Sequence, residues 1–218
     1  MSGSNEGKVE LVVFDLGRVL VRICNDWMHA CEAAGIALDL SQLNTPKLAA
    51  IRSAVHKVET NDLSFDAFAA EVATHLGATK DQVREASAKF ALGLYEGVEP
   101  LLDQLHEAGV ATACLSNTNE HHWGFLADAR HPSYFPLGRL KHHFASHLIR
   151  ARKPSPAIYE HLERETGFTG PAILFFDDLK ENIDAAVARG WRGIWIDPDL
   201  DDPMSQIRAA LKQYQVLG

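Results

Sequence analysis

Three apolar runs in this chain end in side chains that could do chemistry. The runs and the residues that follow them are 12–14 with Asp15, 110–115 with Ser116 and Asn117, and 172–176 with Asp177 and Asp178. A single Asp after such a run commonly caps a turn. Three ends of this kind would meet at one edge of a sheet if the runs were parallel neighbours, and open α/β sheets bind their ligands at that edge. The sequence therefore predicts a polar site there.

A carboxylate in this position suits phosphoryl transfer. It can attack the phosphorus of a phosphomonoester to form an aspartyl-phosphate that water later cleaves, and Asp15 is the predicted nucleophile. Attack on a dianion needs positive charge nearby, and Mg²⁺ prefers carboxylate, carbonyl, water and phosphate oxygens. Asp15, the Gly17 carbonyl and Asp178 would supply such a set. Asp177 could bind the metal directly or hold a metal-bound water.

Further donors are expected around the phosphoryl group. Ser116 and the amides after it, beginning at Asn117, could hold the phosphoryl oxygens, although a Ser that caps the next helix would give the same pattern. Lys153 could neutralise a phosphate oxygen or orient Asp15.

The elements that must position these residues fall into two groups. Helical patterns with caps and terminal glycines cover 26–34, 45–58, 65–76 and 79–90, and the pattern stays helical until about residue 95. From residue 97 helices alternate with strands at 110–115, 144–149, 172–176 and 193–196. This order predicts a doubly wound, Rossmann-like parallel sheet with an inserted helical cap. The predicted parts are a flexible leader (1–7), a core (8–21 and 96–218) and the cap (22–95).

Composition limits the partners. The formal charge of −8 argues against a nucleic-acid backbone. No apolar run approaches the ~18 residues that span a bilayer, and residues 1–7 lack the basic and apolar regions of a signal peptide. We therefore expect a cytoplasmic protein without a membrane partner; its oligomeric state is not readable from these features.

Four ordered motifs carry a family resemblance. They are Phe14-Asp15-Leu16-Gly17, Leu115-Ser116-Asn117-Thr118-Asn119, Arg152-Lys153-Pro154 and Phe176-Asp177-Asp178-x-x-x-Asn182. In these motifs the chain resembles the haloacid dehalogenase-like hydrolases with a small helical cap, most of all a branch that contains sugar-phosphate phosphatases. The resemblance implies a Mg²⁺-dependent phosphatase for a small phosphorylated metabolite, with Asp178 as the direct metal ligand. Asn182 could brace Asp178 or lie on a helix surface.

One position departs from that family. Most phosphatases that the chain resembles have a second Asp two residues after the nucleophile, as general acid and base, and here that position is Gly17. General acid–base help is typically worth about 10²–10⁴ in rate, so slow turnover is expected unless another group substitutes. Asp26, His56 and His122 are candidates for that role.

Other functions remain open at this point. The missing acid would also fit a binding or regulatory protein that has lost catalysis. A phosphonate-cleaving enzyme would need a cap lysine, such as Lys47 or Lys57, and a carbon–halogen hydrolase fits the Asp177-Asp178 pair less well. We expect the cap to select the substrate. Arg18, Arg22 and His56 are candidates to line its entrance, with Arg18 also a candidate phosphate ligand.

Overall fold

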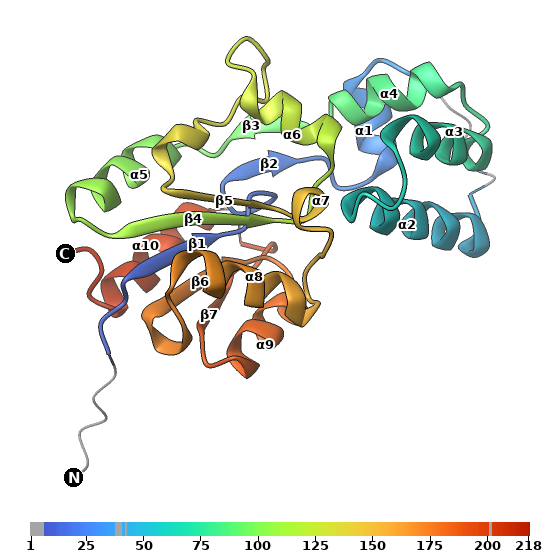
Figure 1. Cartoon of the computed structure of the whole chain (residues 1–218). Helices are drawn as coiled ribbons and strands as arrows, with labels where there is room; N and C mark the ends of the chain where they lie inside the picture. The colour runs from blue at the N-terminus through green and yellow to red at the C-terminus, as the bar shows by residue number, and fades with distance from the viewer. Residues whose placement is uncertain (1–6, 38–40, 42, 201) are drawn as a thin grey trace.

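A five-stranded parallel sheet forms the centre of the chain (Figure 1). The computed structural model describes residues 7–37, 41, 43–200 and 202–218, so most of the predicted leader lies outside it. The strands follow the order β5-β4-β1-β6-β7, and each neighbouring pair is parallel. They are β1 (Leu11–Phe14), β4 (Ala111–Ser116), β5 (His142–Ala145), β6 (Ile173–Asp177) and β7 (Arg192–Trp195). The predicted doubly wound, Rossmann-like fold is confirmed.

Helices cover both faces of this sheet. Val12 and Phe14 of β1 belong to an apolar cluster on one face, and Leu11 and Val13 belong to a cluster on the other. The covering helices are α5 (Val98–Glu107) and α10 (Pro203–Gln213) on the first face, and α8 (Pro156–Thr166) and α9 (Lys180–Ala188) on the second. Because successive strand side chains point to opposite faces, a strand buried on both sides appears in the sequence as an unbroken apolar run.

Four helices between residues 27 and 88 pack on one another beside the sheet. They are α1 (Trp27–Ala33), α2 (Thr45–Glu59), α3 (Phe65–Leu76) and α4 (Lys80–Ala88). Helix α4 begins with a capping box, in which the Thr79 hydroxyl accepts from the Gln82 amide and the Gln82 side chain accepts from the Thr79 amide. Ile51, Phe68 and Val72 are among the buried residues that join α2 to α3. We use "cap" below for these four helices.

Two sequence predictions about secondary structure are wrong. The helical pattern does not continue to residue 95, because β3 (Ala91–Leu94) pairs with β2 (Val21–Ile23) in an antiparallel ribbon. Arg22 and Gly93 interrupt these short strands and remove the apolar alternation that marks a strand. The predicted strand 144–149 is instead the end of β5 followed by the single turn α7 (Ser146–Ile149). The predicted domain boundaries stay a prediction.

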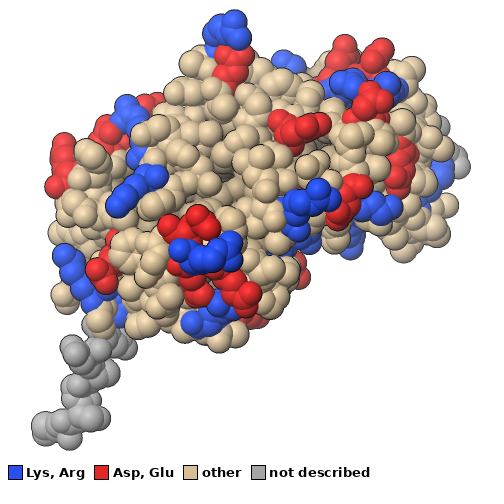
Figure 2. Space-filling view, in the orientation of Figure 1, with Lys and Arg blue, Asp and Glu red and all other residues tan. Residues whose placement is uncertain are grey.

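The remaining elements connect the strands. They are α6 (Glu120–Ala127), the 3₁₀ turn η2 (Leu137–Arg139) and the 3₁₀ turn η3 (Gly170–Ala172). Among the described residues, no helix has the length and apolar character needed to cross a membrane. On the face shown in Figure 2, Lys and Arg side chains are scattered among Asp and Glu.

The cap lies toward the carboxyl ends of the parallel strands (Figure 1). Two ion pairs join it to the core: Arg152 Nε lies 2.8 Å from Glu59 Oε2, and Arg150 lies 3.3 Å from Asp62. The last residue of α2, Glu59, is therefore held against the core segment that precedes Lys153.

Candidate active site

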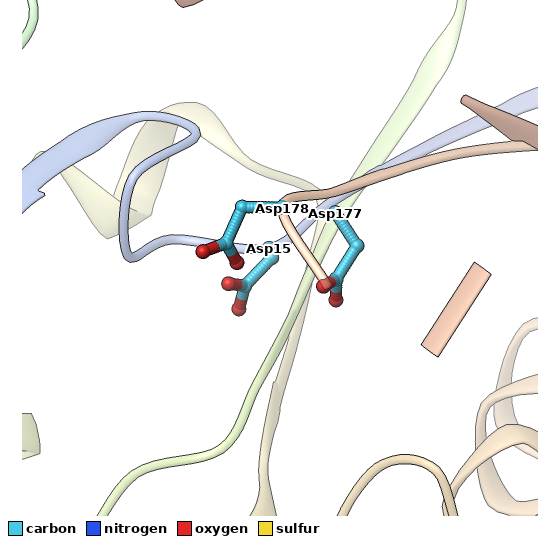
Figure 3. A group of neighbouring side chains, drawn as sticks. All are labelled: Asp15, Asp177 and Asp178. Carbon is cyan, nitrogen blue, oxygen red and sulfur yellow. The ribbon is translucent and has the colours of Figure 1, made fainter. Parts of the chain in front are cut away.

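Three carboxyl groups meet where the central strands end. Asp15 follows β1, Asp177 is the last residue of β6, and Asp178 comes next. Strands β1 and β6 pair with Phe14 opposite Phe176, which brings these ends together. One oxygen from each carboxyl group lies within 4.8 Å of the others, and Figure 3 shows the Asp15 and Asp178 carboxylates turned to the same side. The structure thus brings together the acidic residues that the sequence singled out.

Lys153 is buried between two of these carboxyl groups, with 1% of its side chain exposed. Its Nζ lies 2.8 Å from Asp15 Oδ1 and 2.7 Å from Asp177 Oδ2. Burial alone would lower the pKa of Lys153, but the attraction of both carboxylates outweighs burial and raises the pKa. The ammonium group therefore stays charged, and its contact corresponds to the second role predicted for it, the orientation of Asp15.

Asp177 is fully buried and engaged at both oxygens. Oδ2 accepts from Lys153, and Oδ1 accepts from the Leu179 amide at 2.8 Å and from Asn182 Nδ2 at 2.9 Å. Asn182 therefore braces Asp177, so both the predicted contact with Asp178 and the surface position are wrong. Helix α9 begins only at Lys180, so the helical spacing that would place Asn182 beside Asp178 does not apply.

Asp178 faces a different partner. Its carboxylate lies 3.5 Å from the guanidinium of Arg18, which has a left-handed backbone with φ of 56°. Burial and the Asp177 carboxylate raise the pKa of Asp178, although Arg18 opposes the shift. Burial, Asp177 and Asp178 likewise raise the pKa of Asp15 to about 7, against the opposing effect of Lys153. Burial is the largest cause of both shifts, and the three carboxyl groups share only two contacting cations, Lys153 and Arg18.

Ser116 and Asn117 stand at the end of β4, beside β1. Ser116 is buried, with 5% exposed. The Asn117 side chain donates to the Lys153 carbonyl at 3.0 Å and accepts from the Lys153 amide at 2.8 Å. The Asn117 side chain thus holds the backbone of Lys153, and the predicted binding of phosphate by the Asn117 amide stays a prediction.

Gly17 lies in the tight turn between β1 and β2. A Cβ at this position would lie 3.2 Å from Ile23 Cδ1, which is closer than most side chains pack, so a larger residue would require Ile23 to shift. The position that carries an acid in most of the phosphatases discussed above is thus crowded by β2.

A cavity of about 220 Å³ lies between the strand ends and the cap. Gly17, Ser116 and Asn117 line it from the core, and Glu59 lines it from the last turn of α2. Burial raises the pKa of Glu59, although its ion pair with Arg152 opposes the shift. The sequence predictions did not include Glu59, because a lone Glu at the end of an amphipathic helix carries no motif.

The predicted substitutes for the missing acid lie in different surroundings. His122 lines the cavity, but burial lowers its pKa to about 4, so it is neutral at pH 7. Asp26 caps α1 by accepting from the His29 amide at 2.9 Å, and His56 is exposed on α2. Arg22, predicted at the entrance, donates to the Leu92 carbonyl at 3.1 Å across the ribbon.

The acidic cluster suits a hard divalent cation. Mg²⁺ binds oxygen ligands from few carboxylates and keeps positions for water and phosphate. Asp15 and Asp178 offer such oxygens within 4.8 Å of each other, and together with the engaged Asp177 they outnumber the two cations that contact the cluster. The residues present therefore fit Mg²⁺.

Comparisons with known proteins agree with this geometry. Residues 9–190 match the haloacid dehalogenase-like hydrolase family. Phosphatase MT3486 of Mycobacterium tuberculosis is 27% identical over 146 residues, which are 64% of this chain and 64% of that relative, so the match spans less than two thirds of the relative's length.

Solved structures show the same fold. A HAD family enzyme of Bacteroides thetaiotaomicron has a TM-score of 0.76 at 18% identity, over 93% of this chain and 99% of that one. A predicted HAD-like hydrolase of Porphyromonas gingivalis has a TM-score of 0.75 at 22% identity, over 94% and 99%. The wild-type Bacteroides enzyme in complex with magnesium and inorganic phosphate has a TM-score of 0.72 at 19% identity, over 88% and 96%.

Proposed function

Because the chain belongs to the haloacid dehalogenase-like hydrolases, we propose that it hydrolyses a small phosphomonoester with the help of Mg²⁺ and with Asp15 as the nucleophile. The observation that carries this proposal is the contact of Lys153 with Asp15 at 2.8 Å, inside a cluster of three carboxyl groups. A buried cation that touches one oxygen of a strand-end carboxylate fixes the direction of that carboxylate, as an in-line attack requires.

The reaction has two steps. A carboxylate oxygen of Asp15 attacks phosphorus, the bond from phosphorus to the ester oxygen breaks, and the alcohol leaves after it takes up a proton. Water then attacks the phosphorus of the aspartyl-phosphate, which frees Asp15 and inorganic phosphate and releases a proton. Lys153 holds Asp15 through both steps, and Ser116 donates a hydrogen bond to the transferred group from the end of β4.

We assign the metal to Asp15, Asp178 and the Gly17 carbonyl. When bound there, Mg²⁺ supplies the positive charge that lets a carboxylate approach a phosphate dianion. Asp177 is a positioning residue, because both its oxygens are engaged by Lys153, the Leu179 amide and Asn182.

Proton transfer to the leaving alcohol is the weak point of this site. Gly17 has no side chain to donate a proton, and the neutral His122 holds a hydrogen bond to Ser87. Phosphate compounds with good leaving groups, such as acyl phosphates, should therefore react faster than alkyl phosphates.

The narrower sequence predictions stay predictions. A sugar phosphate as substrate has no support from the cavity described above, whose walls are mostly apolar. Phosphonate cleavage would need a cap lysine in the cavity. The α2 residues that line the cavity are Val55, Val58 and Glu59, and Lys57 is exposed. A cytoplasmic location and the absence of a nucleic-acid partner are untested.

The proposal is tested by phosphate release from acetyl phosphate and a set of phosphomonoesters, with Mg²⁺ or with EDTA. We expect Mg²⁺-dependent release that Asp15→Asn lowers at least about 10³-fold. Asp184→Asn, an exposed change on α9, is the matched control and should leave release unaltered. Phosphate release that persists in Asp15→Asn, or that is unchanged by EDTA, would contradict the proposal. Ligand binding by a folded wild type that releases no phosphate would favour the alternative of a protein that has lost catalysis.

A further inference from the structure

The part of the cavity that lies under the cap has an aromatic wall. Trp27, Phe68, Phe90 and Phe125 line it. The Trp27 ring meets Phe90 edge-on with centroids 5.6 Å apart and lies 6.4 Å from Phe68, so these rings form one continuous surface. Aliphatic side chains, among them Val55 and Ile23, fill the wall between the rings.

Four polar side chains in this wall already have partners. Ser87 and His122 are hydrogen bonded to each other at 2.8 Å between Oγ and Nε2. The Asn119 side chain accepts from the amides of His121 and His122, and Glu59 is paired with Arg152. A ligand with several hydroxyl groups would therefore meet few free donors or acceptors among these groups.

The same cavity reaches the catalytic edge of the sheet. Gly17, Ser116 and Asn117 line it at the strand ends, and the aromatic rings line it together with the aliphatic side chains of the cap side. A phosphomonoester whose phosphate lies at that end has to place its alcohol portion among the rings. The side chains on the cap side of the cavity therefore contact the alcohol portion of the ester and not its phosphate.

The volume limits the size of that alcohol. An apolar cavity of about 150 Å³ is known to bind benzene, and this one measures about 220 Å³. It would accept one ring or a short alkyl chain.

We propose that the substrate is the phosphate ester of a small apolar alcohol and not a sugar phosphate. The inference rests on the proposed function, since it assigns the alcohol portion of that same reaction. An apolar pocket discriminates against an added hydroxyl by about 10²-fold when the hydroxyl finds no partner.

Two substrates of matched shape test the inference. Cyclohexylmethyl phosphate and glucose 6-phosphate both release a primary alcohol attached to a six-membered ring, so their main difference is the hydroxyl groups. We expect kcat/KM for cyclohexylmethyl phosphate to be higher by at least about 10²-fold. Acetyl phosphate serves as a substrate whose small acyl group does not need the aromatic wall.

A cavity-filling variant tests whether the wall is the cause. Val55→Phe puts a ring into the cavity, and we expect it to lower kcat/KM for cyclohexylmethyl phosphate about tenfold more than for acetyl phosphate. Val187→Phe makes the same change on α9, where Val187 is 52% exposed, and should leave the ratio of the two substrates unaltered.

The outcomes separate this inference from the proposed function. A preference for glucose 6-phosphate, or equal rates, would overturn the inference and leave the hydrolase mechanism standing. Release from acetyl phosphate with none from cyclohexylmethyl phosphate would do the same. Failure of every phosphate, acetyl phosphate included, would overturn both.

Discussion

The strand ends and the cap side of the cavity are built on opposite principles. At the strand ends, charged groups are locked by direct contacts, with Lys153 between Asp15 and Asp177 and with Asn182 against Asp177. On the cap side, aromatic and aliphatic side chains predominate and the polar groups satisfy one another. Parallel strands position the charged groups, whereas separate helices carry the apolar side chains. The chemistry and the selectivity of the site can therefore change independently.

This difference predicts that substitutions in the two regions will alter different properties of the enzyme. Changes that leave buried charges at the strand ends without partners should lower kcat and stability together. Changes in the cap should alter KM or the preference among substrates while the chemistry persists.

Lys153→Met is expected to have the largest effect on stability. The variant leaves Asp15 and Asp177 buried without their cation, and removal of one partner from a buried ion pair typically costs about 3–5 kcal/mol. Urea unfolding at pH 7 measures the loss, and phosphate release should fall at least about 10²-fold. Lys57→Met, an exposed change on α2, is the control. A loss below about 1 kcal/mol would show that the strand-end charges are not locked as described.

The pH dependence of the stability of the metal-free protein should show the next largest effect. The pKa of Asp15 is raised from 3.8 to about 7 in the folded chain, so the folded state holds an extra proton between these values. Stability from this group is therefore lost as the pH rises from about 4 to about 7. Asn does not ionise, so in EDTA wild type should lose roughly 1–3 kcal/mol relative to Asp15→Asn between pH 4 and pH 8.

Urea unfolding of both proteins across that pH range measures this difference. The titration of groups that the two proteins share cancels when one stability is subtracted from the other. Mg²⁺ at pH 8 should stabilise wild type more than Asp15→Asn, because a bound ligand stabilises the folded state in proportion to its affinity. Parallel curves for the two proteins would contradict the assignment of surplus charge to Asp15.

Glu59→Gln should have the smallest effect. It weakens the pair between Glu59 and Arg152, which joins the cap to the core at 2.8 Å. A partly exposed pair contributes about 1 kcal/mol or less, so KM should rise no more than about fivefold and kcat should stay within about twofold. Asp62→Asn, which disturbs the more exposed pair with Arg150, is the matched control and should change neither constant. Steady-state kinetics that show a fall in kcat alone would indicate that Glu59 takes part in the chemistry instead.

The strand-end residues could be predicted from the sequence because local patterns mark them. Apolar runs that stop at Asp15, Ser116 and Asp177 are what parallel strands buried on both faces produce. The apolar cavity could not be predicted in this way. Its walls combine β2, the turn before β3 and the helices α1, α2, α3, α4 and α6, and no short-range pattern indicates which helix faces meet.

Two errors have the same origin. Asn182 was predicted either to brace Asp178 or to lie on a helix surface, but α9 starts at Lys180 and Asn182 contacts Asp177 instead. Glu59 has no partner near it in the sequence, and its contact is with Arg152, 93 residues away. Contacts that depend on tertiary packing are those that local patterns cannot supply.

The most direct test of the central claim is to trap the phosphoryl group on the enzyme. Wild type turning over acetyl phosphate with Mg²⁺ would be quenched in acid, digested and analysed by mass spectrometry, with Asp15→Asn as the control. We predict one phosphoryl group on the peptide that contains Asp15, located at that side chain and absent in the variant. Turnover with the phosphoryl group on another residue, or with none on the enzyme, would contradict the assignment of Asp15 as the nucleophile.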